Sequence, residues 1–407
     1  MSQGPLLVVS SAGPPAFAAA LDEARMFPLI EASLADAAKA VAQVQPSAVL
    51  ADMQGGDLAQ FAALAAQIAA RKPYLPLLAV GHGPALPENA IPFSPQDGKF
   101  DRLLPRLRAA LRIRALHVTV LRRLSEEPTT RLPDTDPTRE ATALLIGRGG
   151  AYPALSVALG ERLGVVGAFS IEAAANHLNT RDIDGVVLGE GFSVRVVHAF
   201  LTVLSEDARF RNLPVVLTTG DLAPSYELPN LEIVQGEPAD IAANALPLIR
   251  QHAFEARLSR TLRAIDAQGL LDPQTGLLAK AAFDRDFAHA VGQTLAGGGG
   301  LSVARFVFDP ANPRAQLDGA RIISRLMRRM DFGAAQGDGS VIVAFADTDL
   351  RNAHGIARRL SAVMRHTSTG MRGSRSDPAV TVATLLPKDT AKSLLARLTS
   401  EAQRVAS

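Results

Sequence analysis

The sequence predicts an α/β protein with two doubly wound parallel-sheet domains, followed by an α+β domain. Three observations predict this architecture. Short apolar runs alternate with helix-patterned stretches, the same order recurs after about 135 residues, and the pattern changes beyond residue 268. The apolar runs lack regular polar positions, which is typical of strands that helices cover on both faces.

The first domain is expected over residues 1–124. Each of its apolar runs is four to six residues long, which suits a buried strand, and the stretches between them have helical spacing. The expected elements are strands at 6–9, 48–51, 75–80 and 90–93, and helices after residue 9, over about 57–70 and from about 99 onward.

A polar segment with three prolines, E-E-P-T-T-R-L-P-D-T-D-P-T-R, is expected to be an exposed linker over residues 125–139. The second sheet domain follows over 140–252. Its last helix continues to about 268, since apolar residues keep a helical spacing through Phe254, Leu258 and Leu262. The expected elements are strands at 143–146, 165–169, 185–188, 213–218 and 231–234, and helices near 151–162, 170–178 and 194–206.

The last domain is expected over residues 269–407. Here helices and strands follow in an order that suggests a mixed or antiparallel sheet. The expected elements are helices at 279–293, 314–329 and 349–366, a strand at 302–308, a hairpin at 332–346, a strand at 379–386 and a final helix.

Composition narrows the function classes. The 42 basic and 40 acidic residues nearly cancel, so no charge excess points to nucleic acid. Without any Cys, disulfides and thiolate metal sites are excluded, and a cytoplasmic setting is expected. No stretch reaches the 18 or more apolar residues of a membrane span, and the eight His show no metal-ligand spacing.

Asp52 ends an expected strand of the first domain, where ligands bind in this topology. This domain resembles a response-regulator receiver, in which such an Asp accepts a phosphoryl group. The acidic pair of receivers is replaced by Ser10 and Ser11, and their lysine by Ser94. Asp52 is therefore a candidate phospho-acceptor without metal ligands, and the alternative is an Asp left at a strand end. The second domain is interpreted as a degenerate receiver kept for its surfaces.

The last domain carries the specific motifs. D-P-Q-T-G-L at 272–277, with Phe283 following, is similar to the entry of GGDEF (diguanylate cyclase) domains. Arg328 and Asp331 form an R-x-x-D sequence five residues before G-D-G-S-V at 337–341. An inhibitory R-x-x-D stands at this distance before the G-G-D/E-E-F hairpin of the family. The chain thus resembles the receiver–receiver–GGDEF (PleD-type) family.

The signature itself, at Gly337, Asp338, Gly339 and Ser340, is degenerate: the second glycine has become Asp338, and the two acidic positions are Gly339 and Ser340. A cyclase holds two metal ions with carboxylates, and neither Gly nor Ser supplies a hard anionic ligand at the two acidic positions. We therefore expect no catalytic residue, no metal, no cofactor and no cyclase activity.

The R-x-x-D pair predicts a ligand site. Arg328 can donate two hydrogen bonds to guanine O6 and N7, and Asp331 can accept from guanine N1 and N2. In the family this pair binds an intercalated cyclic di-GMP dimer, assisted by an Arg of the following helix, whose position Arg359 occupies here. The alternative is an Arg-rich helix end that complements the helix dipole.

The resemblance implies a non-catalytic cyclic di-GMP effector in signal transduction. It implies protein partners, including adaptors that deliver cell-cycle regulators to a protease, recruitment to the cell pole, and a homodimer formed through the receiver domains. Two alternatives stay open: a ligand-independent dimeric scaffold built on the receivers, and a divergent diguanylate cyclase.

Overall fold

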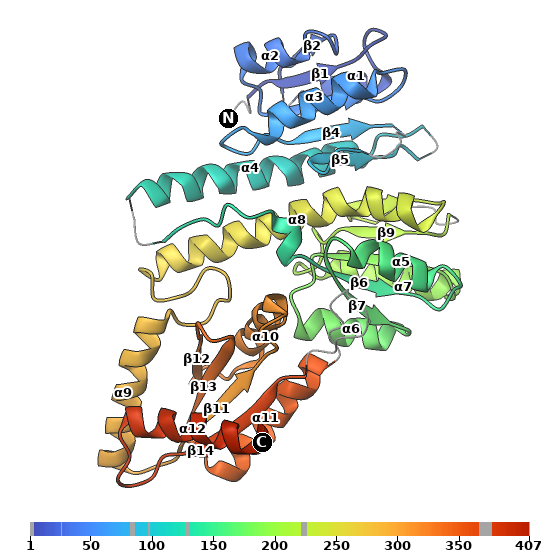
Figure 1. Cartoon of the computed structure of the whole chain (residues 1–407). Coiled ribbons are helices and arrows are strands. Elements are labelled where there is room, and N and C mark those ends of the chain that lie inside the picture. The colour runs from blue at the N-terminus through green and yellow to red at the C-terminus, as the bar shows by residue number, and fades with distance from the viewer. Residues whose placement is uncertain are drawn as a thin grey trace.

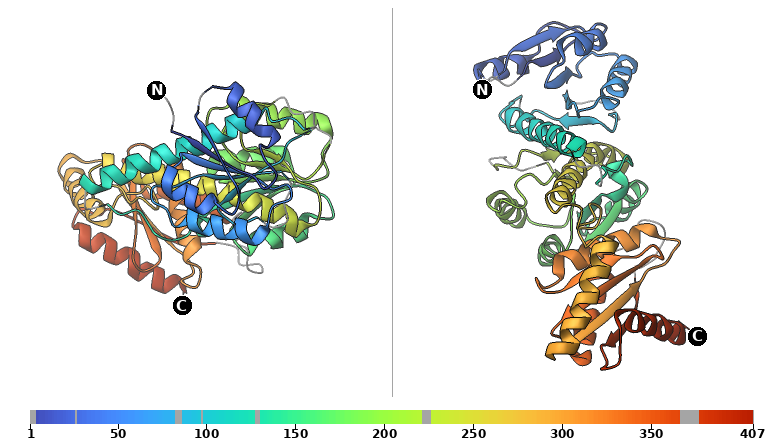
Figure 2. Two further views of the ribbon diagram at one scale, coloured as in Figure 1. Left: turned by 90° about the horizontal axis from the view of Figure 1, so that it is seen from above. Right: turned by 90° about the vertical axis from the view of Figure 1, so that its left-hand side faces the viewer.

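The computed structural model describes residues 4–25, 27–81, 86–96, 98–126, 130–220, 226–365 and 377–406. Three α/β bodies follow one another from the N-terminus to the C-terminus, as the colours of Figure 1 and the right-hand view of Figure 2 show. We call them the first sheet domain, the second sheet domain and the C-terminal domain. No helix in the described part of the chain combines the length and apolarity needed to cross a membrane.

The first sheet domain contains a five-stranded sheet with the strand order β2-β1-β3-β4-β5, in which all neighbours are parallel. Three of these strands, β1, β4 and β5, are fully buried, and β3 is buried up to its last residue, because helices cover both faces. The strands are β1 (Leu6–Val9), β2 (Leu29–Ala32), β3 (Ala48–Asp52), β4 (Leu77–Val80) and β5 (Ala90–Phe93). The helices are α1 (Ala16–Glu23), α2 (Ala37–Val44), α3 (Leu58–Ala69) and α4 (Leu103–Glu126).

The second sheet domain repeats this topology. Its order is β10-β9-β8-β6-β7, again all parallel, which is the order of the first sheet read from the other edge. The strands are β6 (Thr142–Ile146), β7 (Gly164–Ala168), β8 (Gly185–Leu188), β9 (Val215–Leu217) and β10 (Leu231–Ile233). The helices are α5 (Tyr152–Gly160), α6 (Ile171–Thr180), α7 (Val194–Glu206) and α8 (Pro238–Asp266). The expected pair of parallel sheets is confirmed.

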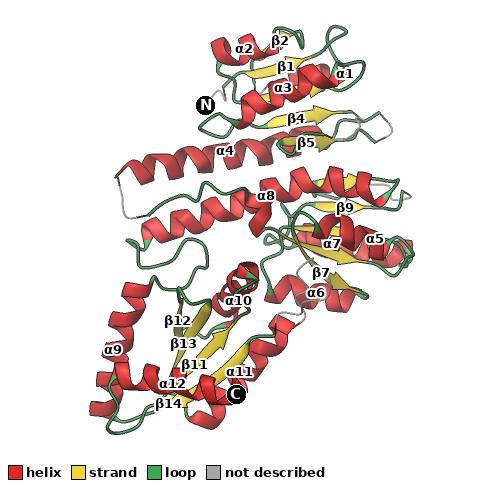
Figure 3. Cartoon of the chain, viewed as in Figure 1, coloured by secondary structure: helices red, strands yellow, loops and turns green. Residues whose placement is uncertain are grey.

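The C-terminal domain contains an antiparallel sheet with the order β12-β13-β11-β14. The α10 and α11 helices share one buried cluster with one face of this sheet, whereas α9 and α12 cover the other face. Figure 3 shows these strands among their helices. The strands are β11 (Leu301–Val307), β12 (Phe332–Ala335), β13 (Ser340–Ala346) and β14 (Ala379–Thr384). The helices are α9 (Lys280–Gly297), α10 (Pro313–Leu326), α11 (Leu350–Arg365) and α12 (Ala391–Ala406).

The two sheet domains share one hydrophobic core. The α4 and α8 helices lie side by side between the two sheets, and one buried cluster contains residues of both domains (Figure 1). Within this interface Arg106 of α4 forms an ion pair with Glu232 of β10, and both side chains are fully buried. Arg106 also donates to the backbone oxygens of Pro229 and Leu231, which anchors α4 to the second domain.

The segment between the sheet domains is partly exposed, as expected of a linker, and partly packed against the protein. Its residues 127–129 lie outside the described residues, and the rest packs along α8 and ends in the short helix η1 (Pro137–Glu140). Thr130 and Thr138 are only 7% and 4% exposed. Arg257 of α8 donates to backbone oxygens of this segment, so its polar groups find partners in the protein rather than in water.

Candidate functional site

The R-x-x-D sequence follows α10. This helix begins where the Asn312 side chain accepts a hydrogen bond from Ala315 N at 3.2 Å, and Pro313 occupies its first turn. It ends at Leu326, three residues earlier than expected, and Met327 is extended. Arg328 and Asp331 then close a tight turn, in which Asp331 N donates to Arg328 O at 3.0 Å. Arg328 and Asp331 are therefore close because they are the first and last residues of this four-residue turn, and not because they lie one turn apart on a helix.

Asp331 differs from the expected surface residue. It is only 7% exposed, and its Oδ1 has no hydrogen-bond partner among the described residues. Burial raises the pKa of this carboxyl, against the opposing effects of the backbone N–H groups of Arg328 and Ala346 and of the Arg328 charge. A buried acceptor without a partner is costly, so Oδ1 of Asp331 has the capacity to accept one more hydrogen bond.

Arg328 and Arg359 both lie on the surface. Arg328 is exposed in the turn beside Met330, which is 60% exposed. Arg359 is exposed on α11, whereas its neighbours Ala357 and Leu360 are buried against the sheet. The α10 and α11 helices pack together on the same sheet face, so the two arginines belong to neighbouring elements. In the described part of the chain, neither guanidinium group makes a hydrogen bond or an ion pair.

The four signature positions form the turn between β12 and β13. Gly339 has a φ of +83°, a conformation that favours glycine. Ser340 is fully buried, and its backbone N and Oγ donate to Asp338 Oδ1 at 3.0 and 2.6 Å. Gly337 has open space around it. The turn thus carries one carboxylate, and this carboxylate is bound by its own hairpin.

Arg305 completes that arrangement, and the sequence analysis missed it. It lies on β11, and its Nη2 donates to Asp338 Oδ2 at 2.7 Å. Its Nε donates to Ser340 Oγ at 3.2 Å. Burial opposes ionisation of Asp338, but the hydrogen bonds from Ser340 and Arg305 outweigh it, so the pKa of Asp338 is lowered. An arginine at an alternating position of a strand gives no signal in the sequence alone.

Asp52 ends β3 and is partly exposed at the carboxyl edge of the first sheet. Its Oδ1 accepts a hydrogen bond from Gln54 N at 3.0 Å. Ser94, at the position where receivers have a lysine, donates its backbone N–H to Glu232 of the second sheet domain at 3.4 Å. Among the described residues, no group of three or more His, Asp or Glu side chains is arranged to hold a metal ion.

The C-terminal domain docks on the second sheet domain through α10. Arg325 donates to Asp182 Oδ1 at 3.0 Å, and Arg321 donates to Glu140 Oε2 at 2.8 Å. From the other side, Arg181 donates to the backbone oxygen of Val363 in α11. Both α10, which precedes Arg328, and α11, which carries Arg359, are therefore held against the second sheet domain.

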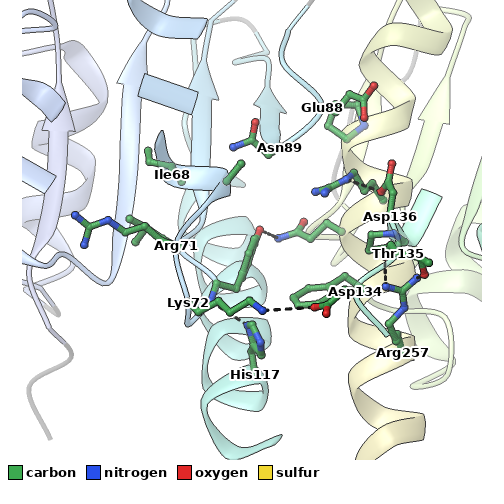
Figure 4. A pocket seen from close by; sticks show the side chains of 18 of the residues that line it. Ile68, Arg71, Lys72, Glu88, Asn89, His117, Asp134, Thr135, Asp136 and Arg257 are labelled. Atoms are coloured by element: carbon green, nitrogen blue, oxygen red, sulfur yellow. Dashed lines mark hydrogen bonds and ion pairs between the residues drawn. The ribbon is translucent and has the colours of Figure 1, made fainter. Parts of the chain in front are cut away.

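A cavity of about 230 Å³ lies between the first sheet domain, the segment before η1, and α8 (Figure 4). Tyr74 borders it, and burial raises the pKa of its hydroxyl to about 12. Four of the charged groups around it are paired: Lys72 with Asp134 at 3.5 Å, and Arg250 with Asp136 at 3.1 Å. These pairs leave no cluster of like charges that would indicate a particular ligand chemistry.

No protein-family model and no curated protein sequence matches this chain. Solved structures that resemble part of it are GGDEF domains. The coiled coil and GGDEF domain of DgcB from Caulobacter crescentus, in complex with c-di-GMP, is 18% identical with a TM-score of 0.30, covering 36% of this chain and 85% of that one.

Two further resemblances are to Pseudomonas aeruginosa proteins. The FimX GGDEF domain is 19% identical with a TM-score of 0.31, covering 33% of this chain and 92% of that one. The diguanylate cyclase SiaD, in complex with its activator SiaC, is 17% identical with a TM-score of 0.32, covering 37% and 65%. Likeness of this degree leaves the function of this chain to be inferred from its own residues.

Proposed function

We propose that this chain is a non-catalytic cyclic di-GMP effector of the PopA type, with two receiver-like domains ahead of a degenerate GGDEF domain. The ligand binds at Arg328, Asp331 and Arg359. One observation carries the proposal: an exposed arginine without a hydrogen bond or ion pair, Arg328, shares a turn with a buried Asp331 oxygen that lacks a donor, and a second such arginine, Arg359, lies on α11, which packs against α10. Guanine supplies the missing donors at N1 and N2 and accepts from an arginine at O6 and N7.

The Arg328–Asp331 turn has to open before a ligand can reach Asp331, because this side chain is buried. The free energy needed to open this turn reduces the affinity for the ligand. The same opening allows the ligand to change the structure next to α10. The turn directly follows α10, which is held against the second sheet domain by Arg321 and Arg325. A ligand that moves the turn therefore biases the docking of the two domains.

The proposed output is recruitment of a protein partner for cell-cycle control at the cell pole, with protease adaptors as the partner class. A homodimer through the receiver-like domains belongs to the same proposal. Since the face formed by α4 and β5 is buried within the chain against α8 and β10, such a dimer must use other surfaces. Asp52 is the position to test for phosphorylation.

The test is calorimetric titration of the full chain with cyclic di-GMP, with GTP as a control ligand. We expect Arg328→Ala and Arg359→Ala to weaken binding by about 5- to 150-fold each, which corresponds to about 1–3 kcal/mol. Arg329→Ala is the matched control, because Arg329 is exposed in the same turn outside the proposed set. Absence of binding to the wild-type chain, or equal losses in Arg328→Ala and Arg329→Ala, would reject the proposal.

The two alternatives have distinct signatures in the same experiments. A ligand-independent scaffold would dimerise in light-scattering measurements without binding any nucleotide. A divergent cyclase would bind GTP and convert it.

A further inference from the structure

A second cavity, of about 320 Å³, lies where the second sheet domain, α8 and α10 meet. It is separate from the Arg328 site, since none of the three proposed ligand residues lines it. Four arginines and two aspartates provide its charged lining, and they are Arg260, Arg263, Arg321, Arg325, Asp182 and Asp272.

The two aspartates are already engaged. Asp182 accepts from Arg325 at 3.0 Å. Asp272 accepts from Gln274 N at 3.0 Å and from Thr275 Oγ1 at 2.7 Å within its own turn. Asp182 thus binds Arg325 by a hydrogen bond, and its charge also attracts Arg260.

Two arginines of the cavity, Arg260 and Arg321, share the carboxylate of Glu140 with Arg257, which lies outside the cavity lining. Glu140 accepts from Arg321 at 2.8 Å and from Arg257 at 3.0 Å. Arg260 also depends on it, but at 3.6 Å, which is beyond hydrogen-bond distance for an N–H donor. Glu140 thus serves three buried guanidinium groups, and Asp182 and Asp184 add their attraction at Arg260.

Arg260 has a donor that the protein does not satisfy. Its side chain is 8% exposed, and its Nε has no hydrogen-bond partner among the described residues. Burial, followed by repulsion from Arg321, lowers the pKa of Arg260 to about 10. Arg263 lies one helical turn further along α8 and is exposed, with a single 3.4 Å hydrogen bond from its Nε to Ser259 O.

We propose that this cavity binds a small phosphate-bearing anion between Arg260, Arg263 and Arg321. Guanidinium groups bind phosphate oxygens with paired, charge-assisted hydrogen bonds, and an uncharged or singly charged ligand would not offset three arginines. The volume is near the lower limit for ligand pockets, which suits inorganic phosphate, pyrophosphate or the phosphate end of a nucleotide.

The bound anion competes with Glu140 for Arg260 and Arg321. The contacts of Glu140 connect η1 with α8 and α10. The bound anion therefore weakens these contacts between the second sheet domain and the C-terminal domain, and it forms new contacts between α8 and α10. The residues of this site differ from those proposed for cyclic di-GMP. Because ligands at both sites act on α10, we expect binding at one site to change the affinity of the other.

The test is calorimetric titration of the full chain with pyrophosphate at fixed ionic strength. We expect saturable binding, weakened about tenfold in Arg263→Ala because a charge-assisted hydrogen bond is lost. Arg122→Ala is the matched control, since Arg122 is an exposed arginine on α4, away from the cavity. Glu140→Gln is expected to bind pyrophosphate more tightly, because it removes the competing charge.

Phosphate and GTP titrations distinguish the sources of the anion: tighter binding of GTP than of pyrophosphate indicates a nucleotide. Arg328→Ala should leave pyrophosphate binding unchanged. No saturable binding to the wild-type chain, equal affinities in Arg263→Ala and Arg122→Ala, or loss of binding in Arg328→Ala would each overturn the proposal. If Glu140→Gln does not fold, the comparison of pyrophosphate affinity between Arg263→Ala and Arg122→Ala still tests the proposal.

Discussion

The Nη2 of Arg305 on β11 lies 2.7 Å from Oδ2 of Asp338, which stands in the turn between β12 and β13. Ser340 binds the other oxygen of the same carboxylate. The carboxylate is therefore engaged by a cation and a hydroxyl of the protein. We infer that this hairpin holds its own shape and does not form a two-metal site.

The first prediction concerns catalysis. With GTP and Mg²⁺, we expect the wild-type chain to form no cyclic di-GMP, because Gly339 and Ser340 supply no metal ligand. Arg305→Ala frees Asp338 but should also remain inactive, since one carboxylate does not replace two. Chromatography of the nucleotides after long incubation checks this. Product above the level of a heat-denatured sample, in either protein, would contradict it.

The second prediction concerns Asp331. Its pKa is raised by burial, so the fold favours the neutral form, and the ionised carboxylate opposes folding at neutral pH. Asp331→Asn should therefore raise the melting temperature at pH 7, with a gain that shrinks as the pH falls toward about 4, where Asp331 also becomes neutral. Cyclic di-GMP should bind this variant more weakly, because an amide cannot accept from both guanine donors as a carboxylate does.

Calorimetric melting at several pH values, combined with titration, separates the two roles of Asp331. A variant with lower stability at pH 7 would show that the carboxylate is needed for folding. Unchanged cyclic di-GMP affinity would remove Asp331 from the ligand site.

The third prediction concerns Glu140. Its carboxylate balances Arg257, Arg260 and Arg321, whose side chains are 3%, 8% and 6% exposed. Because Glu140→Ala leaves three buried cations without this partner, we expect it to lower the free energy of unfolding by about 3–5 kcal/mol. The control is Glu255→Ala, which removes a pair with the half-exposed Arg112 and should cost under about 1 kcal/mol. Denaturant titration measures both, and similar losses would argue against a central role for Glu140.

The fourth prediction concerns acid sensitivity. Asp184 is 5% exposed and accepts from Thr142 N at 2.9 Å, with His252 Nδ1 at 3.4 Å. Burial raises the pKa of this carboxyl, but the effects of His252, Thr142 and Arg260 together outweigh it, and the net pKa is lowered. A lowered folded-state pKa contributes stability above the unfolded value of 3.8, which is lost as the pH falls through the folded value.

Asp184→Asn should therefore reduce stability at pH 7 and flatten its decline between about pH 5 and pH 3. Unfolding by urea at several pH values gives the two curves. The Asp52→Asn variant serves as the control, because Asp52 is only partly exposed at a sheet edge without an ion pair among the described residues. Parallel curves for the wild type and Asp184→Asn would assign the acid sensitivity to other groups.

Much of the architecture could be predicted because it depends on local pattern. Buried strands such as β3 and β8 are continuous apolar runs, and the duplicated order of elements predicted two parallel sheets. The β2 strand was not separated from its flanking helices, because Leu29–Ala32 is short, half-buried and contains Glu31. The end of α10 was placed too late, because Met327–Arg329 has a helical composition and only the burial of Asp331 requires a turn there.

The sequence alone determined the order of the elements, the missing carboxylates at Gly339 and Ser340, and the spacing of Arg328 to the hairpin, since these depend on residue type and position. Only the tertiary structure decided which partners the charged side chains contact. The pairing of β11 with β13 brings Arg305 to Asp338, and domain packing brings Arg321 to Glu140, 181 positions away. It also buries Asp331 and leaves Arg328 exposed. Contacts between distant residues follow from how whole faces pack, and no local pattern contains that information.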